Sequence, residues 1–204
     1  MKKHVLFIFL VIISVSLTRA QFNSGSKMVG ASSNLDFGIF SDKDKDATDA
    51  TKIISIDINP RAAYFLKNRI AIGGDVEYYM YRSKYADLDP STSNTFLIGP
   101  FARYYYKTVA MVVPFAELNG GIGSSVDKYV DSFTGEEFKT KHSIFYLGAG
   151  VGAAFFLADN FSFEGMLNYS FEHQKNKETE GSHNTNGVMF NFGFSFYFNS
   201  LLQD

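Results

Sequence analysis

The sequence predicts an all-β fold, an eight-stranded antiparallel up-and-down transmembrane β-barrel, from three observations. Residues 190–198 place phenylalanine at every second position, with small or polar residues between. Seven further segments alternate in the same way, more weakly, and a signal-like apolar segment precedes them all. Side chains of a strand alternate between its two faces, so each segment presents one apolar face. Such a face is stable in lipid and prone to aggregation in water.

Residues 1–20 have the pattern of a secretory signal peptide. Lys2 and Lys3 give the positive start, residues 5–17 form an apolar run, and Ala20 supplies a small residue at the cleavage site. The apolar run is shorter than the roughly 20 residues that a membrane-spanning helix needs. We therefore expect cleavage before Gln21, and a single barrel domain formed by residues 21–204.

Eight alternating segments follow one another along the chain, and no stretch has a helical period. They comprise residues 27–37, 52–65, 70–81, 95–106, 109–126, 143–157, 161–172 and 187–198. The connections at 66–69, 107–108 and 158–160 are short, whereas those at 39–51, 82–94, 127–142 and 173–186 are long and polar. Barrels of bacterial outer membranes have an even strand number, short periplasmic turns and longer outside loops. The pattern therefore predicts both termini on the periplasmic side.

Each segment has one apolar face, and the opposite face is small or polar. In chain order the apolar faces include Val29 and Leu35; Ile54, Ile56 and Ile58; Ile72, Val76 and Tyr78; Phe96, Ile98 and Ala102; Ala116, Leu118 and Ile122; Leu147, Ala149 and Val151; Phe163, Leu167 and Tyr169; and the final phenylalanine row. The opposite faces carry glycine, serine, asparagine, carboxylates and two arginines.

The lysines indicate which face is inside. A soluble barrel would place the apolar face inside and the polar face in water. All twelve lysines beyond residue 20 lie in predicted connections or at segment ends, whereas a water-facing sheet should carry lysine in mid-strand. We therefore expect the polar face to line a narrow lumen and the apolar face to meet lipid.

Tyrosines cluster near the predicted segment ends, as in the aromatic girdles of lipid-spanning barrels. One rim is predicted to carry Tyr78, Tyr79 and Tyr81, and the other Tyr64, Tyr104, Tyr105, Tyr106 and Tyr197.

Four stretches carry a resemblance to a known family. They are INPRAAYFL at 58–66, LIGPFARYYY at 97–106, the glycine-rich segment 143–157 and the final segment. Over residues 21–200 the chain resembles small outer-membrane β-barrels of the OmpX and OmpA-transmembrane type, in particular the porin-family barrel proteins of Bacteroidota. The resemblance implies a Gram-negative outer membrane, contact with its lipid and lipopolysaccharide, and insertion by the barrel-assembly machinery. In the final segment, the residues that resemble the insertion signal read by that machinery are Asn191, Gly193, Phe196 and Phe198.

Charged residues on the polar faces should meet inside the barrel. They are Arg61, Asp75, Glu77, Arg103, Glu117 and Glu164. The interior of an eight-stranded barrel is just wide enough to be filled by side chains. We expect these six to form an ion-pair and hydrogen-bond network that fills the lumen. A path for protons or small ions along the same groups is the alternative.

Three other sets of residues are weaker candidates for chemistry. The first long connection is similar to a calcium loop but lacks its glycine and its terminal glutamate, so a solvated acidic loop is expected; its aspartates are Asp42, Asp44, Asp46 and Asp49. His173 and His183 share the last long connection without an evident third metal ligand. His142 and Ser143 are adjacent and should point to opposite faces, which disfavours a hydrolase that acts on lipid A.

Composition excludes several classes of protein. The absence of cysteine excludes disulfides and thiol chemistry. Without residues 1–20, 16 basic and 21 acidic residues remain, which gives no basic surface for nucleic acid. We expect a monomeric, non-enzymatic outer-membrane barrel, without cofactor or metal, whose long loops carry a structural or surface-interaction role. A narrow channel for water or small ions and a membrane subunit of a secretion or uptake complex stay open, and a lipid A-modifying enzyme is least favoured.

Overall fold

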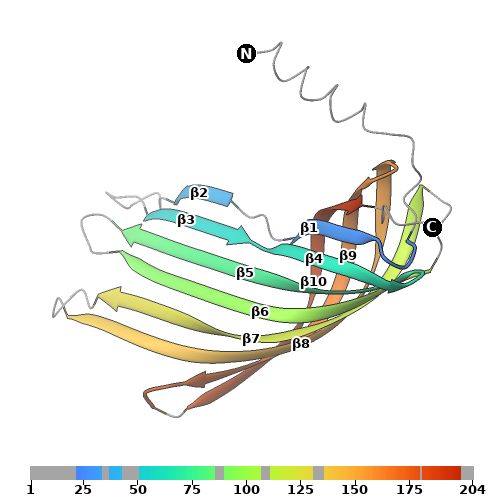
Figure 1. Cartoon of the computed structure of the whole chain (residues 1–204). Coiled ribbons are helices and arrows are strands. Elements are labelled where there is room, and N and C mark those ends of the chain that lie inside the picture. Colours follow the sequence, from blue (N-terminus) through green and yellow to red (C-terminus); the bar gives the residue numbers. More distant parts are fainter. Residues whose placement is uncertain are drawn as a thin grey trace, which may run out of the picture.

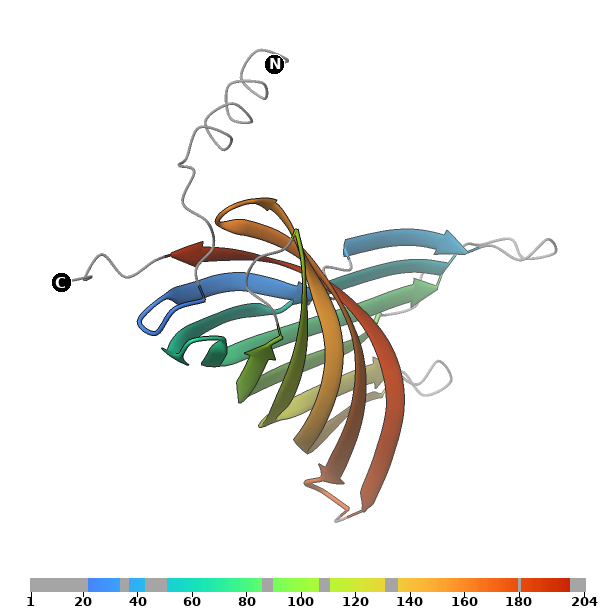
Figure 2. The same ribbon diagram turned by 90° about the vertical axis from the view of Figure 1, so that its right-hand side faces the viewer.

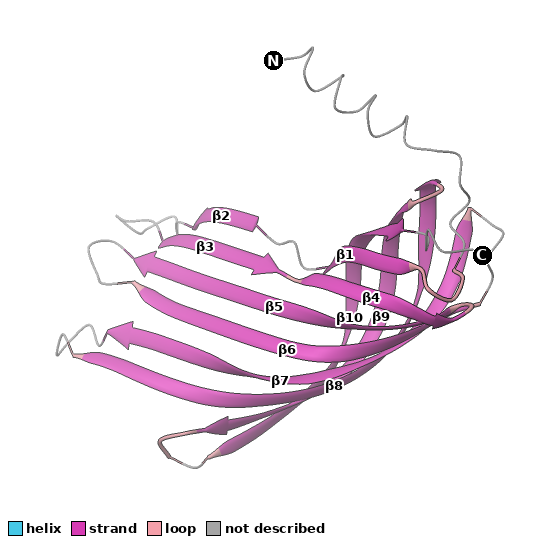
Figure 3. Ribbon diagram, viewed as in Figure 1, coloured by secondary structure: helices cyan, strands magenta, loops and turns pink. Residues whose placement is uncertain are grey.

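The computed structural model describes residues 22–33, 37–42, 51–85, 90–106, 111–130, 136–179 and 181–198. The predicted signal peptide and its cleavage site lie outside these ranges. The regular structure of the described part is strand throughout (Figure 3). No helix within these ranges is long and apolar enough to cross a membrane.

The described strands form one antiparallel sheet that closes on itself. In chain order they are β1 (Lys27–Ser33), β2 (Phe37–Asp42), β3 (Thr51–Ile58), β4 (Pro60–Lys67), β5 (Ile70–Tyr85), β6 (Ser91–Tyr105), β7 (Val112–Val130), β8 (Glu137–Ala158), β9 (Phe161–Asn176) and β10 (Ser182–Phe198). The sheet order is β2-β3-β5-β4-β1-β10-β9-β8-β7-β6, and β5 also pairs with β6. This pairing completes a ring through β5, β4, β1, β10, β9, β8, β7 and β6. Figure 1 shows β5 to β8 side by side, and Figure 2 shows β10 lying against β1.

The ring confirms the predicted eight-stranded barrel, although the first two predicted segments are each divided. β3 and β4 both pair with β5, one beyond the other, so they are two halves of one barrel strand. Pro60 directly follows the break at Asn59 and has no backbone N–H to give to the ladder, which accounts for the interruption. β1 pairs with β4 and β2 pairs with β3 in the same divided manner.

The strands on the side of the long connections extend further than predicted. β5 continues to Tyr85, β6 begins at Ser91, β7 reaches Val130 and β8 begins at Glu137. The predicted long loops 82–94, 127–142 and 173–186 are therefore wrong in extent, because most of their residues are strand. A membrane crossing needs only about 9–11 residues of strand. Strands β5 to β10 have 15 to 22 residues, so their ends project beyond the lipid, where water meets both faces and no alternation marks the strand.

Exposure follows the predicted faces along the membrane-spanning part. Along β6 it alternates without exception from Leu97 to Tyr105, with the odd-numbered residues buried inside. Two tyrosines correct the predicted girdle. Tyr105 and Tyr197 are buried inside the barrel, whereas Tyr104 lies exposed on the outside. Their inward position follows from strand parity, because each shares its face with buried polar residues of the same strand, such as Arg103 and Ser195.

Candidate functional site in the barrel lumen

Five of the six predicted lumen residues lie together in one layer across the barrel, here called the ion-pair layer. It consists of Arg61 on β4, Asp75 on β5, Arg103 on β6, Glu117 on β7 and Glu164 on β9. All five side chains are buried. Register brings two of the pairs face to face, since Arg61 lies opposite Asp75 and Arg103 opposite Glu117 on neighbouring strands. The bond from Arg103 to Glu164 crosses the lumen.

Glu117 is the centre of the ion-pair layer. Its Oε1 accepts a hydrogen bond from Arg61 Nη2 at 2.8 Å, and its Oε2 accepts one from Arg103 Nε at 2.7 Å. Arg103 Nη1 donates to Glu164 Oε2 at 2.6 Å, and Arg61 Nη2 lies 3.9 Å from Asp75 Oδ2. Charge-assisted bonds of this length are among the strongest that side chains make. Two cations thus balance most of the charge of three carboxylates in a site closed to water.

Aromatic rings cover both guanidinium groups. The Arg61 guanidinium carbon lies 3.9 Å from the centre of the Phe101 ring, and that of Arg103 lies 4.0 Å from the centre of the Phe115 ring. A cation over a ring face is attracted by the negative charge of the π system. The rings also hold the guanidinium planes in place, so the arginines are fixed by stacking as well as by ion pairs.

Almost no free space remains at the level of the ion-pair layer. The cavity bounded by Arg61, Arg103, Phe115 and Glu164, among others, has a volume of about 10 Å³. A water molecule requires at least about 10–15 Å³ measured in this way. The described side chains therefore fill the barrel at this level.

An aromatic plug closes the lumen on the short-turn side of the ion-pair layer. It consists of Phe22, Phe65, Tyr105, Phe156 and Tyr197. Phe22 precedes β1 in the chain and lies at the centre of the aromatic plug. Its ring is stacked on that of Tyr105, with ring centres 4.3 Å apart.

Backbone and side-chain hydrogen bonds anchor the aromatic plug. The carbonyl of Phe22 accepts a bond of 2.7 Å from the N–H of Arg69, in the β4–β5 turn. Arg69 has φ of 71°, a left-handed turn conformation. Tyr197 Oη donates to Glu164 at 3.0 Å and Arg103 Nη1 donates to Tyr105 Oη at 3.2 Å, so the aromatic plug and the ion-pair layer are one connected structure.

Glu77, the sixth predicted residue, lies outside the ion-pair layer. It lines a cavity of about 240 Å³ on the far side of that layer from the aromatic plug. Asn59 Nδ2 donates to Glu77 Oε2 at 3.4 Å, and no ion pair of the described residues includes Glu77. Sequence reasoning grouped Glu77 with the others by its face and could not assign its level along the barrel.

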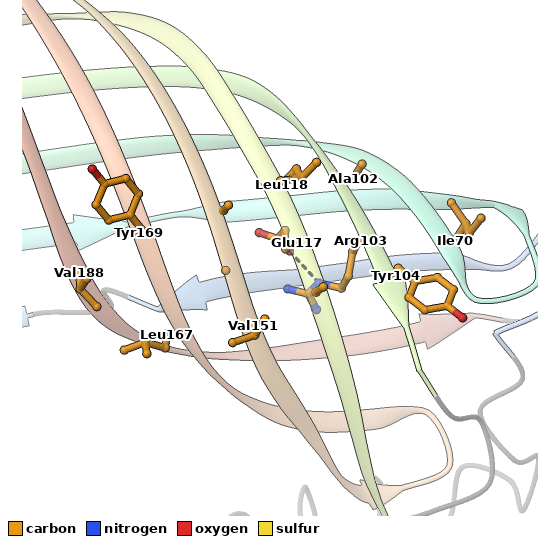
Figure 4. A pocket seen from close by; sticks show the side chains of 13 residues that line it. Ile70, Ala102, Arg103, Tyr104, Glu117, Leu118, Val151, Leu167, Tyr169 and Val188 are labelled. Atoms are coloured by element: carbon orange, nitrogen blue, oxygen red, sulfur yellow. Dashed lines mark hydrogen bonds and ion pairs between the residues drawn. The ribbon is translucent and has the colours of Figure 1, made fainter.

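The outer wall is apolar, and one part of it is hollowed. Leu118 and Val151 are 64% and 63% exposed, and Leu167, Tyr169 and Val188 lie around them on neighbouring strands. They line a hollow of about 610 Å³ (Figure 4). The same view shows Arg103 and Glu117 joined by their ion pair. A surface of this kind is stable against lipid chains and unfavourable in water.

The other residues proposed as metal ligands do not form a common site among the described residues. The four aspartates of the first long connection lie at residues whose side chains are outside the described part. His183 lies opposite Gln174 and His173 opposite Asn184, so the two histidines point to opposite faces of the β9–β10 hairpin. No group of three potential metal ligands occurs among the described residues.

His142 has a carboxylate neighbour that the sequence did not reveal. Its Nε2 lies 3.5 Å from Asp127 Oδ2, across the β7–β8 pair. Ser143 points to the other face, and Ser125, opposite His142, bonds to Thr95 and Asp127. Within the described part of the chain no hydrogen bond joins a serine hydroxyl to His142, so the hydrogen-bonded chain of a hydrolase triad is not formed there.

Comparison with known proteins bears on the fold. No family model matches this sequence, and no curated protein matches it. The solved structure of Neisserial surface protein A is similar to this chain with a TM-score of 0.50 at 14% identity, over 85% of this chain and 97% of that one. The outer membrane protein OprG from Pseudomonas aeruginosa is similar with a TM-score of 0.50 at 12% identity, over 90% of this chain and all 100% of that one.

This chain has the fold of a small outer-membrane β-barrel. The closed ring, the apolar outer wall and the match along nearly the whole length of both neighbours agree on it. The predicted resemblance to small outer-membrane barrels is confirmed at the level of the fold. Both neighbours are outer-membrane or surface proteins by name.

Proposed function

We propose that this chain is a non-conducting, non-enzymatic barrel of the bacterial outer membrane, with a structural or surface-interaction role. The observation that carries the proposal is the closed lumen. The ion-pair layer leaves a cavity of only about 10 Å³, and the aromatic plug lies directly below it. A barrel filled in this way offers its outer wall to lipid and its projecting strand ends to the outside, so contact with other macromolecules is made there.

The surroundings of the barrel follow from the same proposal. Membrane lipid and lipopolysaccharide contact the apolar wall, and the barrel-assembly machinery reads Asn191, Gly193, Phe196 and Phe198 on β10 during insertion. The barrel is a monomer. Pairing of β1 with β10 closes the ring of strands, so at that level no strand edge is left unpaired for a second molecule to cover.

A labelling experiment tests which end of the barrel faces outward. The chain has no cysteine, so single cysteines can be introduced without background. Thr179→Cys lies in the β9–β10 turn and Asp159→Cys in the β8–β9 turn, at opposite ends of the barrel. A maleimide that cannot cross membranes should label Thr179→Cys in intact cells, and Asp159→Cys only after the outer membrane is opened. The reverse pattern would contradict the proposed orientation.

Planar bilayers test the closed lumen. The purified barrel should give no steady unitary conductance steps, because no described gap passes the ion-pair layer. Gly150→Leu, which directs its side chain toward Met166 in the lumen, is the control. Steady steps from the unmodified barrel that this substitution abolishes would establish the alternative, a narrow channel for water or small ions.

A further inference from the structure

The cavity beyond the ion-pair layer has a wall composed mainly of hydrogen-bond acceptors. It is here called the acceptor cavity, and its polar lining comes from β5, β7, β8, β9 and β10 and from Asn59. Four carboxylates line it: Asp75, Glu77, Glu117 and Glu172. Arginines of the ion-pair layer balance Asp75 and Glu117. No ion pair of the described residues includes Glu77 or Glu172, so two acidic side chains face the cavity without a cation.

Three asparagines add unused acceptors to the same wall. The Oδ1 atoms of Asn59, Asn168 and Asn191 are buried and have no hydrogen-bond partner among the described groups. Asn168 is only 5% exposed, so its carbonyl group is withdrawn from bulk water. The side-chain amide N–H of Asn59 already donates to Glu77, so the Oδ1 atom of Asn59 is the part of this amide that has no partner. A buried acceptor without a donor costs free energy, so the cavity favours a ligand that brings donors.

Three donors in or beside the wall are already engaged. Tyr146 Oη donates to Asp75 at 3.2 Å, Asn119 Nδ2 donates to Glu117 at 3.5 Å, and Gln174 donates to Glu172 at 2.6 Å from beside the cavity. The charge of Glu77 is also repelled by Asp57, Asp75 and Glu172. A complementary ligand therefore carries positive charge together with several N–H donors.

The size of the cavity and the positions of its acceptors narrow the class of ligand further. A volume of about 240 Å³ is below the roughly 300–1,000 Å³ of sites for drug-sized ligands. The described residues contain no group of three or more histidine, cysteine, aspartate or glutamate side chains that could hold a metal ion, which disfavours a compact dication. Glu77 and Glu172 lie on β5 and β9, and Leu97, Met166 and Met189 provide apolar wall beside them. A short alkyl chain with an ammonium group at each end matches this distribution.

We propose that the acceptor cavity binds small aliphatic diamines. The ammonium groups donate to Glu77, Glu172 and the asparagine oxygens, and the methylene chain contacts Leu97 and the two methionines. The site lies beyond the ion-pair layer and requires no passage through the barrel. Its existence is therefore independent of whether the lumen conducts.

Calorimetric titration of the refolded barrel in detergent with 1,4-diaminobutane tests the proposal. Binding should saturate at one site, and Glu77→Gln and Glu172→Gln should each weaken it by tenfold or more while keeping the side-chain shape. Glu137→Gln is the matched control, because Glu137 is exposed at the start of β8 and outside the cavity. That variant should bind as the unmodified barrel does. The heat-dependent gel mobility of each variant verifies that it is folded.

Two further probes define the ligand class. The uncharged 1,4-butanediol should not bind, and sodium chloride at the concentration of the diamine should not displace it. Saturable binding of the diol, displacement by equal sodium, or diamine binding that both glutamine variants leave unchanged would overturn the proposal. So would the absence of saturable diamine binding to the folded barrel.

Discussion

Arg103→Leu should lower the free energy of unfolding by about 3–5 kcal/mol, the range for breaking a buried ion pair from one side. Arg103 is 2% exposed and bonds to Glu117, Glu164 and Tyr105. Leucine leaves Glu164 without a cation and Glu117 with Arg61 alone. Urea titration in detergent micelles measures the change, and the temperature at which gel mobility shifts should fall with it.

Two companion variants separate the loss of the ion pair from other effects. Arg82→Leu makes the same substitution at an exposed position of β5 and should leave the urea midpoint unchanged. Adding Glu164→Gln to Arg103→Leu should restore part of the loss, because it removes one unbalanced buried charge. Equal midpoints for Arg103→Leu and Arg82→Leu would show that the ion-pair layer adds nothing to stability.

Phe22→Ala should destabilise the barrel by about 3–5 kcal/mol, the usual cost of removing a buried phenylalanine ring. Phe22 is 2% exposed, and its ring centre lies within 5.7 Å of those of Tyr105, Tyr197, Phe65 and Phe156. Alanine leaves a cavity in the middle of the aromatic plug. The same urea titration measures the effect.

The matched control for Phe22 is Phe138→Ala. Phe138 is 40% exposed near the start of β8 and contacts Tyr129 with ring centres 5.2 Å apart. Its removal opens no enclosed cavity, so the midpoint should change much less. Phe22→Leu should retain most of the stability by filling the space with another apolar side chain. If Phe22→Ala and Phe138→Ala were equally destabilising, Phe22 would not be an internal anchor.

The faces of the membrane-spanning strands could be predicted because lipid and lumen impose opposite requirements on alternate residues. Ile98 and Arg103 fall on opposite sides of β6 for that reason alone. The composition of the ion-pair layer followed from the same parity. Its bonding did not, since the contact from Arg103 to Glu164 crosses the lumen between strands that are not neighbours.

Features that leave no repeating pattern of apolar and polar residues could not be predicted from the sequence. Phe22 lies in no alternating segment, and only the fold shows that it turns into the barrel and stacks on Tyr105. The projecting ends of β7 and β8 were assigned to loops because polar residues occupy both faces there. The acceptor cavity depends on the level of each side chain along the barrel, which register determines and composition does not.

The closure between β1 and β10 has a consequence for the order of folding. It pairs Lys27 with Phe198, almost the first described residue with the last. The entropy lost in bringing two chain positions together grows with the length between them, and contacts distant in sequence form slowly. The β5–β10 meander can therefore assemble from local hairpins, while the final seam must wait for both termini. Until then β10, which carries the phenylalanine row, has an unpaired backbone edge. The lifetime of that state sets the period in which the nascent barrel needs protection from aggregation.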